Sequence, residues 1–386
     1  MRLKLNLPAD YTFLSELMYE GILYTVLRSE CSININEIIF KDPVFLGKLF
    51  ASLKDDEISE IGVSMAGKND TLNEKIFGKF NIINVSSKKT YRDLMFLLKN
   101  YSAKLISKNI IEVKLDRSKK LLLMDAKRKE DGVQAALFKI DRYTGLSSFE
   151  SNSTSQQITF YFSKEVALLF LLGIYSSFTT TVVKQRKRMY YFLFFSPEEI
   201  IRLLSRENRL LLDKYFSVKK KTKDSLKQIL KSYQSNELIL TEILLNTKIH
   251  NLMIRENLDK VSLTLFRVAH EGQTYKIYEV VPINLYRESS FYRIASKYFR
   301  NPMQLANQVS KILSPNEAIL KNISNPKAEE NSNLIKAING LYRFVIFGNM
   351  QGWFDFIREL WNAHEKKKDK TGRSIYLNLL KMLSYV

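Results

Sequence analysis

The chain is poor in cysteine, histidine, proline and glycine for its 386 residues. Cys31 is the one cysteine, so no disulfide can form within the chain and metal sites made of four cysteines are excluded. The three histidines, His250, His270 and His364, do not have the spacing of metal ligands. Neither a glycine-rich phosphate loop with its lysine nor a paired-serine motif is present. We therefore expect no metal site, no cofactor and no catalytic residues.

Positive charge is what the sequence has in surplus. Sixty Lys and Arg stand against forty Asp and Glu, a net charge of +20. Such a surplus indicates a polyanionic partner, either nucleic acid or an anionic membrane. Abundant Lys and Ile with little Gly and Pro also fit a thermophile or an AT-rich genome, which would account for part of the charge. The opening MRLKLNLPADYTFLSELM lacks a cleavable apolar segment, so we expect a cytoplasmic protein.

The segment Ile158–Phe195 predicts the middle of a folded core. Its sequence is ITFYFSKEVALLFLLGIYSSFTTTVVKQRKRMYYFLFF. ITFYF alternates like a strand, and VALLFLLGIY is apolar on every face, like a helix buried on all sides. The β-branched SSFTTTVV and the aromatic YYFLFF predict two further strands. The basic residues between them would lie on a loop held by the core, where binding residues tend to be found.

A membrane span is the alternative interpretation of the same segment. Val166–Val183 contains eighteen residues without a charge, which is long enough to cross a bilayer. Its second half, however, carries five hydroxyl side chains between Ser176 and Thr181. A core helix followed by a strand explains this composition better, so we expect no membrane partner.

Basic residues are concentrated between Thr181 and Lys231. Fourteen basic and five acidic residues occupy these fifty-one positions, a surplus of nine. Arginine can bind phosphate with two parallel hydrogen bonds, and aromatic residues follow the first cluster directly. Two solvated loops would be the simpler explanation. The residues that we expect to bind nucleic acid are Lys184, Arg186, Lys187, Arg188, Lys219, Lys220, Lys221 and Lys223.

The remaining patterns predict an α+β fold with three parts. We expect an α/β core domain over residues 1–195, with a central sheet and the buried helix. A basic helical segment and a β-hairpin would form 196–286, and a helical bundle 287–386. Within these parts, Asp10 would cap a helix to about Ser29, and 110–115 would form a hairpin with 121–126. Ser196-Pro197-Glu198-Glu199 starts a helix that would end near Phe216, where the run KKKTK would interrupt it.

One pattern points to an enzyme instead. The apolar strand LLLMDAKRK contains Asp125 and Lys127, with Asp116 before it and Gln134 after it. This arrangement resembles the metal-dependent core of restriction-type nucleases, whose carboxylates hold a divalent metal while a lysine positions the attacking water. An acid two residues before a lysine is common by chance in so charged a chain, and Asp116 also suits a turn. Phe138 stands where the branch of those nucleases nearest to this pattern has tyrosine.

Five segments together resemble a known family, the large subunit of archaeal type I-A CRISPR interference (Cascade) complexes. In order they are LNLPADYTFLSELMYEG, KIDRYTGLSSFE, LLFLLGIYSSF, YYFLFFSPEE and KIYEVVPINLY, spread from Leu5 to Tyr286. The resemblance implies a non-enzymatic DNA-binding subunit of an RNA-guided complex. Such a subunit recognises a short motif beside the target in double-stranded DNA and helps to open the duplex. Its partners would be CRISPR RNA and the backbone, small, helicase and nuclease subunits.

Overall fold

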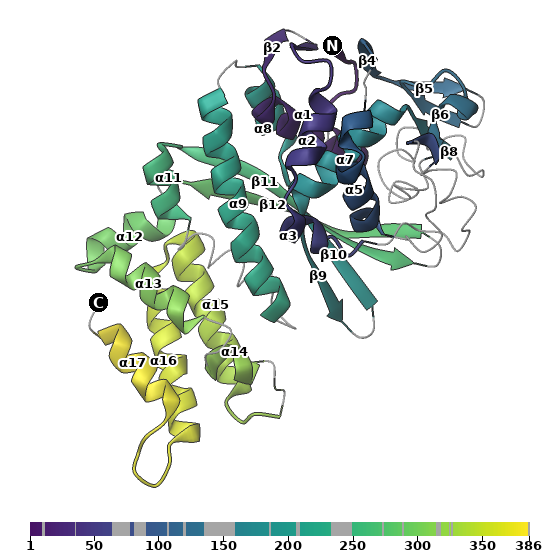
Figure 1. The fold of residues 1–386 in the computed structure, drawn as a ribbon. Coiled ribbons are helices and arrows are strands. Elements are labelled where there is room, and N and C mark those ends of the chain that lie inside the picture. Colours follow the sequence, from purple (N-terminus) through teal and green to yellow (C-terminus); the bar gives the residue numbers. More distant parts are fainter. Residues whose placement is uncertain are drawn as a thin grey trace. The chain divides into compact units, whose positions relative to one another are not determined.

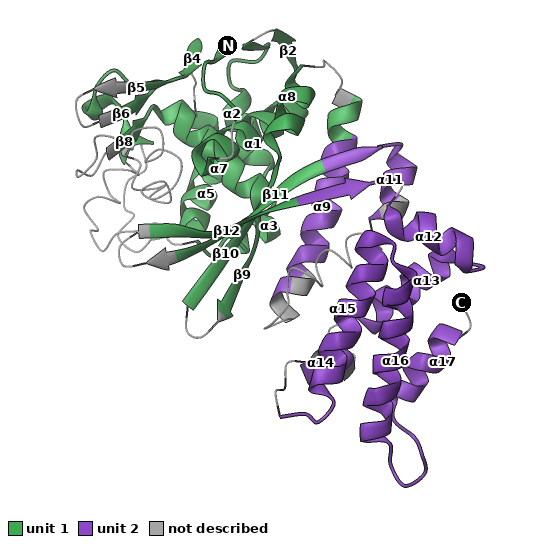
Figure 2. Ribbon diagram, turned by 180° about the vertical axis from the view of Figure 1, so that it is seen from behind, with its two compact units in different colours: residues 1–213, 262–282 green, residues 214–261, 283–386 purple. Residues whose placement is uncertain are grey.

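The computed structural model is of the α+β class, as the sequence predicts (Figure 1). It describes residues 1–9, 12–34, 36–63, 78–80, 90–105, 108–118, 121–134, 159–184, 187–205, 209–232, 249–271, 274–287, 289–313, 318–323, 325 and 327–384. The chain forms two compact units (Figure 2). The first consists of Met1–Asp213 and Ser262–Pro282, and the second of Lys214–Val261 and Ile283–Val386. The three-part division at 195/196 and 286/287 stays a prediction.

The described strands form three four-stranded sheets, with the orders β2-β3-β1-β4, β12-β11-β10-β9 and β5-β6-β8-β7. Their bounds are β1 Arg2–Leu5, β2 Cys31–Asn34, β3 Glu37–Phe40, β4 Ile110–Val113, β5 Leu115–Ser118, β6 Leu121–Met124, β7 Val133–Gln134, β8 Thr159–Phe162, β9 Phe178–Lys184, β10 Lys187–Phe195, β11 Lys260–Glu271 and β12 Thr274–Tyr286.

The hairpin expected between 110–115 and 121–126 is wrong in its first half. β4 leaves this pair and lies parallel to β1, so that Ile111 is opposite Leu3. Only β5 turns back onto β6, with Leu115 opposite Met124. The alternating pattern identifies strands but does not select their partners, because partner choice depends on the buried faces of distant segments.

Four of the following six α-helices of the first unit begin at a side-chain cap. The six are α1 Phe13–Arg28, α2 Phe45–Ser52, α3 Asp55–Ser59, α5 Tyr91–Asn100, α7 Lys164–Ser177 and α8 Pro197–Leu204, with short 3₁₀ turns at Ser102–Lys104 and Lys129–Asp131. The hydroxyl of Ser196 accepts a hydrogen bond from the backbone N–H of Glu199, which confirms the predicted start of α8. Thr12 caps α1, and the predicted cap Asp10 lies outside the described residues.

Two buried helices, α1 and α7, cross at a pair of glycines. A Cβ atom at Gly173 would lie 2.1 Å from the carbonyl oxygen of Leu17, and one at Gly21 would lie 2.0 Å from that of Leu169. Any larger residue would therefore collide with backbone. The ring of Phe13 on α1 meets Phe192, Phe194 and Phe266 edge-on, at centroid distances of 5.3, 5.5 and 5.4 Å. Helix α1 thus fixes the position of strands β10 and β11.

The second unit is predominantly helical. Helix α9, Arg209–Ser232, begins within the first unit, and α11 is His250–Glu256. The other helices are α12 Ser290–Tyr298, α13 Pro302–Ile312, α14 Ala318–Ile323, α15 Asn331–Phe347, α16 Met350–Lys367 and α17 Ile375–Ser384. Their shared core of Leu, Ile, Val and aromatic side chains confirms the bundle that the sequence predicts.

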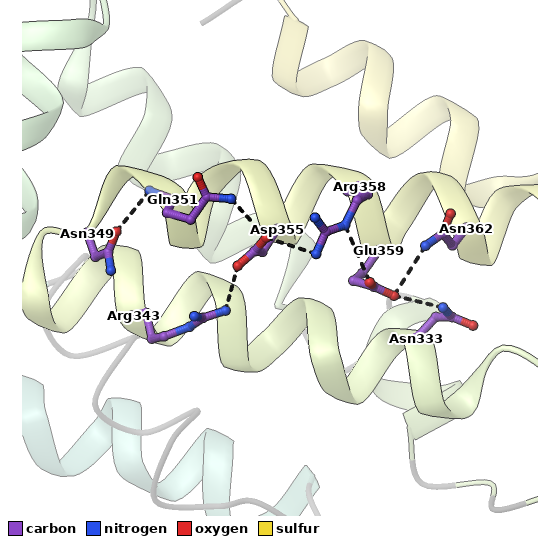
Figure 3. A network of polar contacts seen from close by, with 8 residues as sticks. All are labelled: Asn333, Arg343, Asn349, Gln351, Asp355, Arg358, Glu359 and Asn362. Carbon is purple, nitrogen blue, oxygen red and sulfur yellow. Dashed lines mark hydrogen bonds and ion pairs between the residues drawn. The ribbon is translucent and has the colours of Figure 1, made fainter.

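Helices α15 and α16 are joined by close backbone contact and by a polar network. Cβ atoms at Gly340 and Gly352 would each lie within 3 Å of the other glycine's carbonyl oxygen, at 2.8 and 2.5 Å. Along the same contact, Asp355 accepts hydrogen bonds from Arg343 at 2.7 Å and Gln351 at 3.2 Å, and its carboxylate lies 2.9 Å from the Arg358 guanidinium (Figure 3). One turn later, Glu359 accepts a hydrogen bond from Asn333 at 2.8 Å and a longer one from Asn362 at 3.4 Å.

Candidate nucleic-acid interface

Lys184 ends strand β9, and Lys187 and Arg188 begin strand β10; both strands are labelled in Figure 1. The strands are antiparallel, and their register places Lys187 directly opposite Lys184 and Arg188 opposite Val183. Both Lys187 and Arg188 are exposed. Arg186 and the side chain of Lys184 lie outside what the structure describes. This end of the strand pair therefore offers two exposed positive charges, those of Lys187 and Arg188.

The hairpin is held by the interior of the sheet. From Tyr190 to Phe195 every side chain of β10 is buried, and β11 pairs with β10 along this whole length. Burial raises the pKa of Tyr191, although Arg267 on β11 acts in the opposite direction. The basic end therefore continues a buried and paired aromatic strand, which fixes the backbone of Lys187 and Arg188.

The second basic run lies inside one long helix. The expected break at KKKTK is wrong, because α9 continues without interruption for 24 residues through Lys219–Lys223. Lysine has a good helix propensity, and the spacing of buried residues persists across the run at Tyr215, Val218, Thr222 and Leu226. Helix α8 instead ends at Leu204, and residues 206–208 lie outside the described residues.

Helical geometry separates the four lysines of this run. Lys220 and Lys221 are exposed, and Lys223 is half-buried. Lys219 is only 2% exposed, since it lies on the buried face one turn from Tyr215, with its ammonium 5.7 Å from the ring centre of Phe216. A buried ammonium does not reach a phosphate on the surface. The exposed part of the run is therefore Lys220 and Lys221, and Lys223 is half-buried.

A second hairpin at the same end of the sheet adds groups that the sequence analysis missed. Because β11 runs antiparallel to β10, its last residues lie beside the first residues of β10, with Ala269 opposite Met189. Strand β12 starts three residues after β11 ends, and its Lys276 and Tyr278 are exposed. The sequence predicts a β-hairpin here, and KIYEVVPINLY is one segment of the family resemblance, but neither singles out these two side chains. A lysine and a tyrosine two residues apart on an outward face were the available signal.

Asp125 of the nuclease pattern is engaged in local structure. Its carboxylate lies 2.6 Å from the ammonium of Lys108, and it accepts hydrogen bonds from the Ser163 hydroxyl at 2.6 Å and the Glu112 backbone N–H at 3.1 Å. Its backbone has a φ of +56°, in the left-handed region that aspartate tolerates better than most residues. Asp116 forms an ion pair with Lys114 at 2.8 Å, and Lys127 is exposed. Asp125 thus joins β6, β4 and the start of α7.

One comparison with known proteins places the chain in a family. A protein of Archaeoglobus fulgidus, itself described as uncharacterized, is 46% identical over 396 aligned positions that cover all of both chains. The two proteins belong to one family. No protein-family model matches the chain, and no solved structure does. Family membership therefore gives an archaeal relative that aligns along its full length with this chain, and the chemistry has to be argued from the residues.

Two kinds of feature, a metal site and a membrane-spanning helix, can be checked in the described residues. Among them, no group of three or more His, Cys, Asp or Glu side chains is arranged to hold a metal ion. In the same part of the chain no helix has both the length and the apolar character needed to cross a bilayer. Helix α7 is apolar because it packs inside the first unit, next to α1. The exposed basic residues of the β9–β10 hairpin and of α9 have the charge that an anionic ligand requires.

Proposed function

We propose that the protein is a non-catalytic, DNA-binding large subunit of a type I-A CRISPR RNA-guided interference complex. The observation that carries this proposal is the basic end of the β9–β10 hairpin, where Lys187 and Arg188 are both exposed and Lys187 pairs with Lys184 in the strand register. In such complexes guide pairing reads the sequence, and the protein supplies a positive surface and a few contacts to base edges. The family resemblance of the sequence supports the same assignment.

The proposed partners follow from the surfaces of each unit. Exposed lysines on α9 and the β9–β10 hairpin would contact the backbone of double-stranded target DNA. The subunit would recognise the target-adjacent motif and help to open the duplex in the cytoplasm of an archaeal cell. On α16, Phe354 and Trp361 are 57% and 49% exposed, which supplies apolar surface for another subunit of the complex. CRISPR RNA, the backbone and small subunits, and the helicase and nuclease would complete the assembly.

A salt titration of duplex binding tests the hairpin. The double variant Lys187→Gln/Arg188→Gln should bind matched and mismatched duplexes equally less well, because phosphate contacts carry no direct base information. For every phosphate that the variant no longer neutralises, the slope of log affinity against log salt should flatten by about 0.9. A charge-matched control is Lys41→Gln/Lys48→Gln, whose side chains are 76% and 73% exposed. An affinity and a slope that both stay at the wild-type value would refute a role for the hairpin.

Three further measurements decide the rest of the assignment. Lys220→Gln/Lys221→Gln tests α9 with the same titration. Incubation of DNA with magnesium or manganese tests the nuclease alternative, and cutting that disappears in Asp125→Ala and Lys127→Ala would replace our proposal. Purification of the native complex, followed by sequencing of its RNA, tests membership of an RNA-guided assembly, because a chain recovered without guide RNA would contradict it.

A further inference from the structure

The beginning of strand β12 presents an aromatic ring to solvent. Every second side chain from Lys276 to Val280 is exposed, whereas Tyr275 is 1% exposed. Tyr278, in the centre of this row, is 38% exposed. The ammonium of Lys276 lies 5.9 Å from the centre of the Tyr278 ring, within the range of a cation–π contact. One face of β12 thus combines a flat ring with a positive charge.

This face belongs to the same end of the same sheet as the basic hairpin. The sheet order is β12-β11-β10-β9, so β11 alone separates β12 from β10. Strands in a sheet are about 4.8 Å apart, so two such spacings separate the strand of Tyr278 from that of Lys187. Glu279 forms an ion pair with Arg267, which lies opposite Tyr191, so Tyr278 is also about four residues along the sheet from Lys187, roughly 17 Å away in all. A single nucleic-acid strand that contacts the hairpin through its phosphates is therefore within reach of the ring.

The exposed side chains Lys276, Tyr278 and Val280 suit an unpaired nucleic-acid strand better than a duplex. Bases in a duplex are stacked on one another and offer no free face, whereas an unpaired base can stack on an exposed aromatic side chain. Proteins that hold single strands combine such rings with a positive groove that follows the backbone. An apolar protein partner would suit this row less well, because it would cover the positive charges of Lys276 and the nearby hairpin without supplying an anion.

We propose that Tyr278 stacks on an unpaired base of single-stranded DNA, while Lys276 contacts a flanking phosphate. The inference rests on the proposed function, in which opening of the target duplex releases a single DNA strand. It places the binding site of that DNA strand on the first unit. The hairpin residues Lys187 and Arg188 then serve both the duplex and the strand that leaves it.

Binding of a fluorescent oligo-dT strand, beside a duplex of equal length, tests the stacking role. Tyr278→Ala should weaken oligo-dT binding by about 5- to 150-fold, the range expected for loss of one stacking ring, and should leave duplex binding nearly unchanged. Tyr278→Phe keeps the ring and should restore binding. Tyr298→Ala is the control, since that tyrosine on α12 is 65% exposed. Tyr278→Trp adds a second readout, because its emission should be quenched by oligo-dT and not by duplex.

The outcomes separate this inference from the function on which it rests. Unchanged oligo-dT binding in Tyr278→Ala would overturn the stacking role, even if the hairpin variant still bound duplex less tightly. An equal loss for duplex and single strand would also overturn it, since stacking requires an unpaired base. Failure of the wild-type protein to bind either DNA would refute the proposed function itself.

Discussion

Two carboxylates on α16 are kept ionised by their neighbours. Hydrogen bonding from Gln351, with the charges of Arg358 and Arg343, lowers the pKa of Asp355 from its ordinary 3.8. Burial is the largest influence on Glu359 and would raise its pKa, but hydrogen bonds from Asn333 and Asn362 and two nearby cations together lower it from 4.5. Both groups therefore stabilise the α15–α16 contact in their charged form.

The pH dependence of bundle stability follows from these shifts. A carboxyl whose folded pKa is lowered contributes stability above its unfolded pKa and loses that contribution as pH falls through the folded value. We expect the free energy of unfolding to decrease as the pH is lowered below about 4.5. In Asp355→Asn the slope of this decrease should be smaller, by an amount that corresponds to the uptake of up to about one proton on unfolding. Urea unfolding between pH 3 and 7 measures the slope. Asp259→Asn, which alters a side chain that is 83% exposed, is the control; an unchanged slope in Asp355→Asn would contradict the assignment.

Asp125 is predicted to act in folding, because its carboxylate satisfies three donors from separate segments. Its side chain is 8% exposed, so Asp125→Ala deprives Ser163, Lys108 and the Glu112 N–H of their acceptor in a mostly buried place. We expect a decrease of about 2 kcal/mol in the free energy of unfolding. Asp116→Ala, at a side chain that is 59% exposed, should change stability by less than about 0.5 kcal/mol. Equal stabilities of the two variants would remove the structural explanation of Asp125.

At the scale of elements, the crossing of α1 and α7 admits only glycine. In Gly173→Ala the added Cβ would meet the Leu17 carbonyl oxygen at 2.1 Å, so the helices would have to separate. Overpacking of this kind costs about 1–3 kcal/mol, and we expect the upper part of that range because backbone, not a side chain, is in the way. Gly78→Ala is a matched control, since nothing lies within 4 Å of its added Cβ. Thermal unfolding of the two variants makes the comparison, and equal midpoints would show that the helices yield easily.

Local patterns were enough to predict many elements. The apolar helix after ITFYF, the two strands that follow it, and the Ser196-Pro197 helix start are all present in the structure. What the sequence could not provide is the choice of distant partners. β4 pairs with β1 more than a hundred residues earlier, while the nearby β6 pairs with β5 and β8. Several strand pairings would satisfy the same alternation, and the buried faces decide among them.

The candidate interface was predictable to a similar extent. The run KQRKR was expected on a loop between two strands, which is wrong for most of it: Lys184 ends β9, and Lys187 and Arg188 begin β10. The exposure that a binding surface requires is present at Lys187 and Arg188. The charge of the run KKKTK predicts a break in the helix, whereas the helical spacing of apolar residues continues through the run. The buried positions Tyr215, Val218, Thr222 and Leu226 include Lys219 on their face of the helix, so its burial could have been predicted by extending the helical pattern.

For the whole molecule, part of the α16 surface is predicted to be covered by a partner subunit. Of the six apolar side chains between Trp353 and Trp361, Phe356 and Leu360 are fully buried, while Phe354 and Trp361 remain about half exposed. Phe354→Ser/Trp361→Ser should leave the isolated chain as stable as wild type within about 1 kcal/mol and should reduce co-purification of other subunits several-fold. Ile201→Ser, at an α8 side chain that is 60% exposed, is the control. Undiminished recovery of the partners would show that this surface is free in the assembly.

The order in which the chain passes between its two units determines when the first unit can fold during synthesis. Residues 214–261 belong to the second unit, yet they precede Ser262–Pro282, which completes the first. On the ribosome, β10 emerges with only β9 available as a neighbour, and its aromatic residues await β11 until some seventy further residues have been translated. Domains that are continuous in sequence can fold one after another as they emerge, but this first unit cannot. A transcript truncated near codon 213 would therefore yield a chain with an unpaired aromatic edge, open to aggregation or to capture by a chaperone.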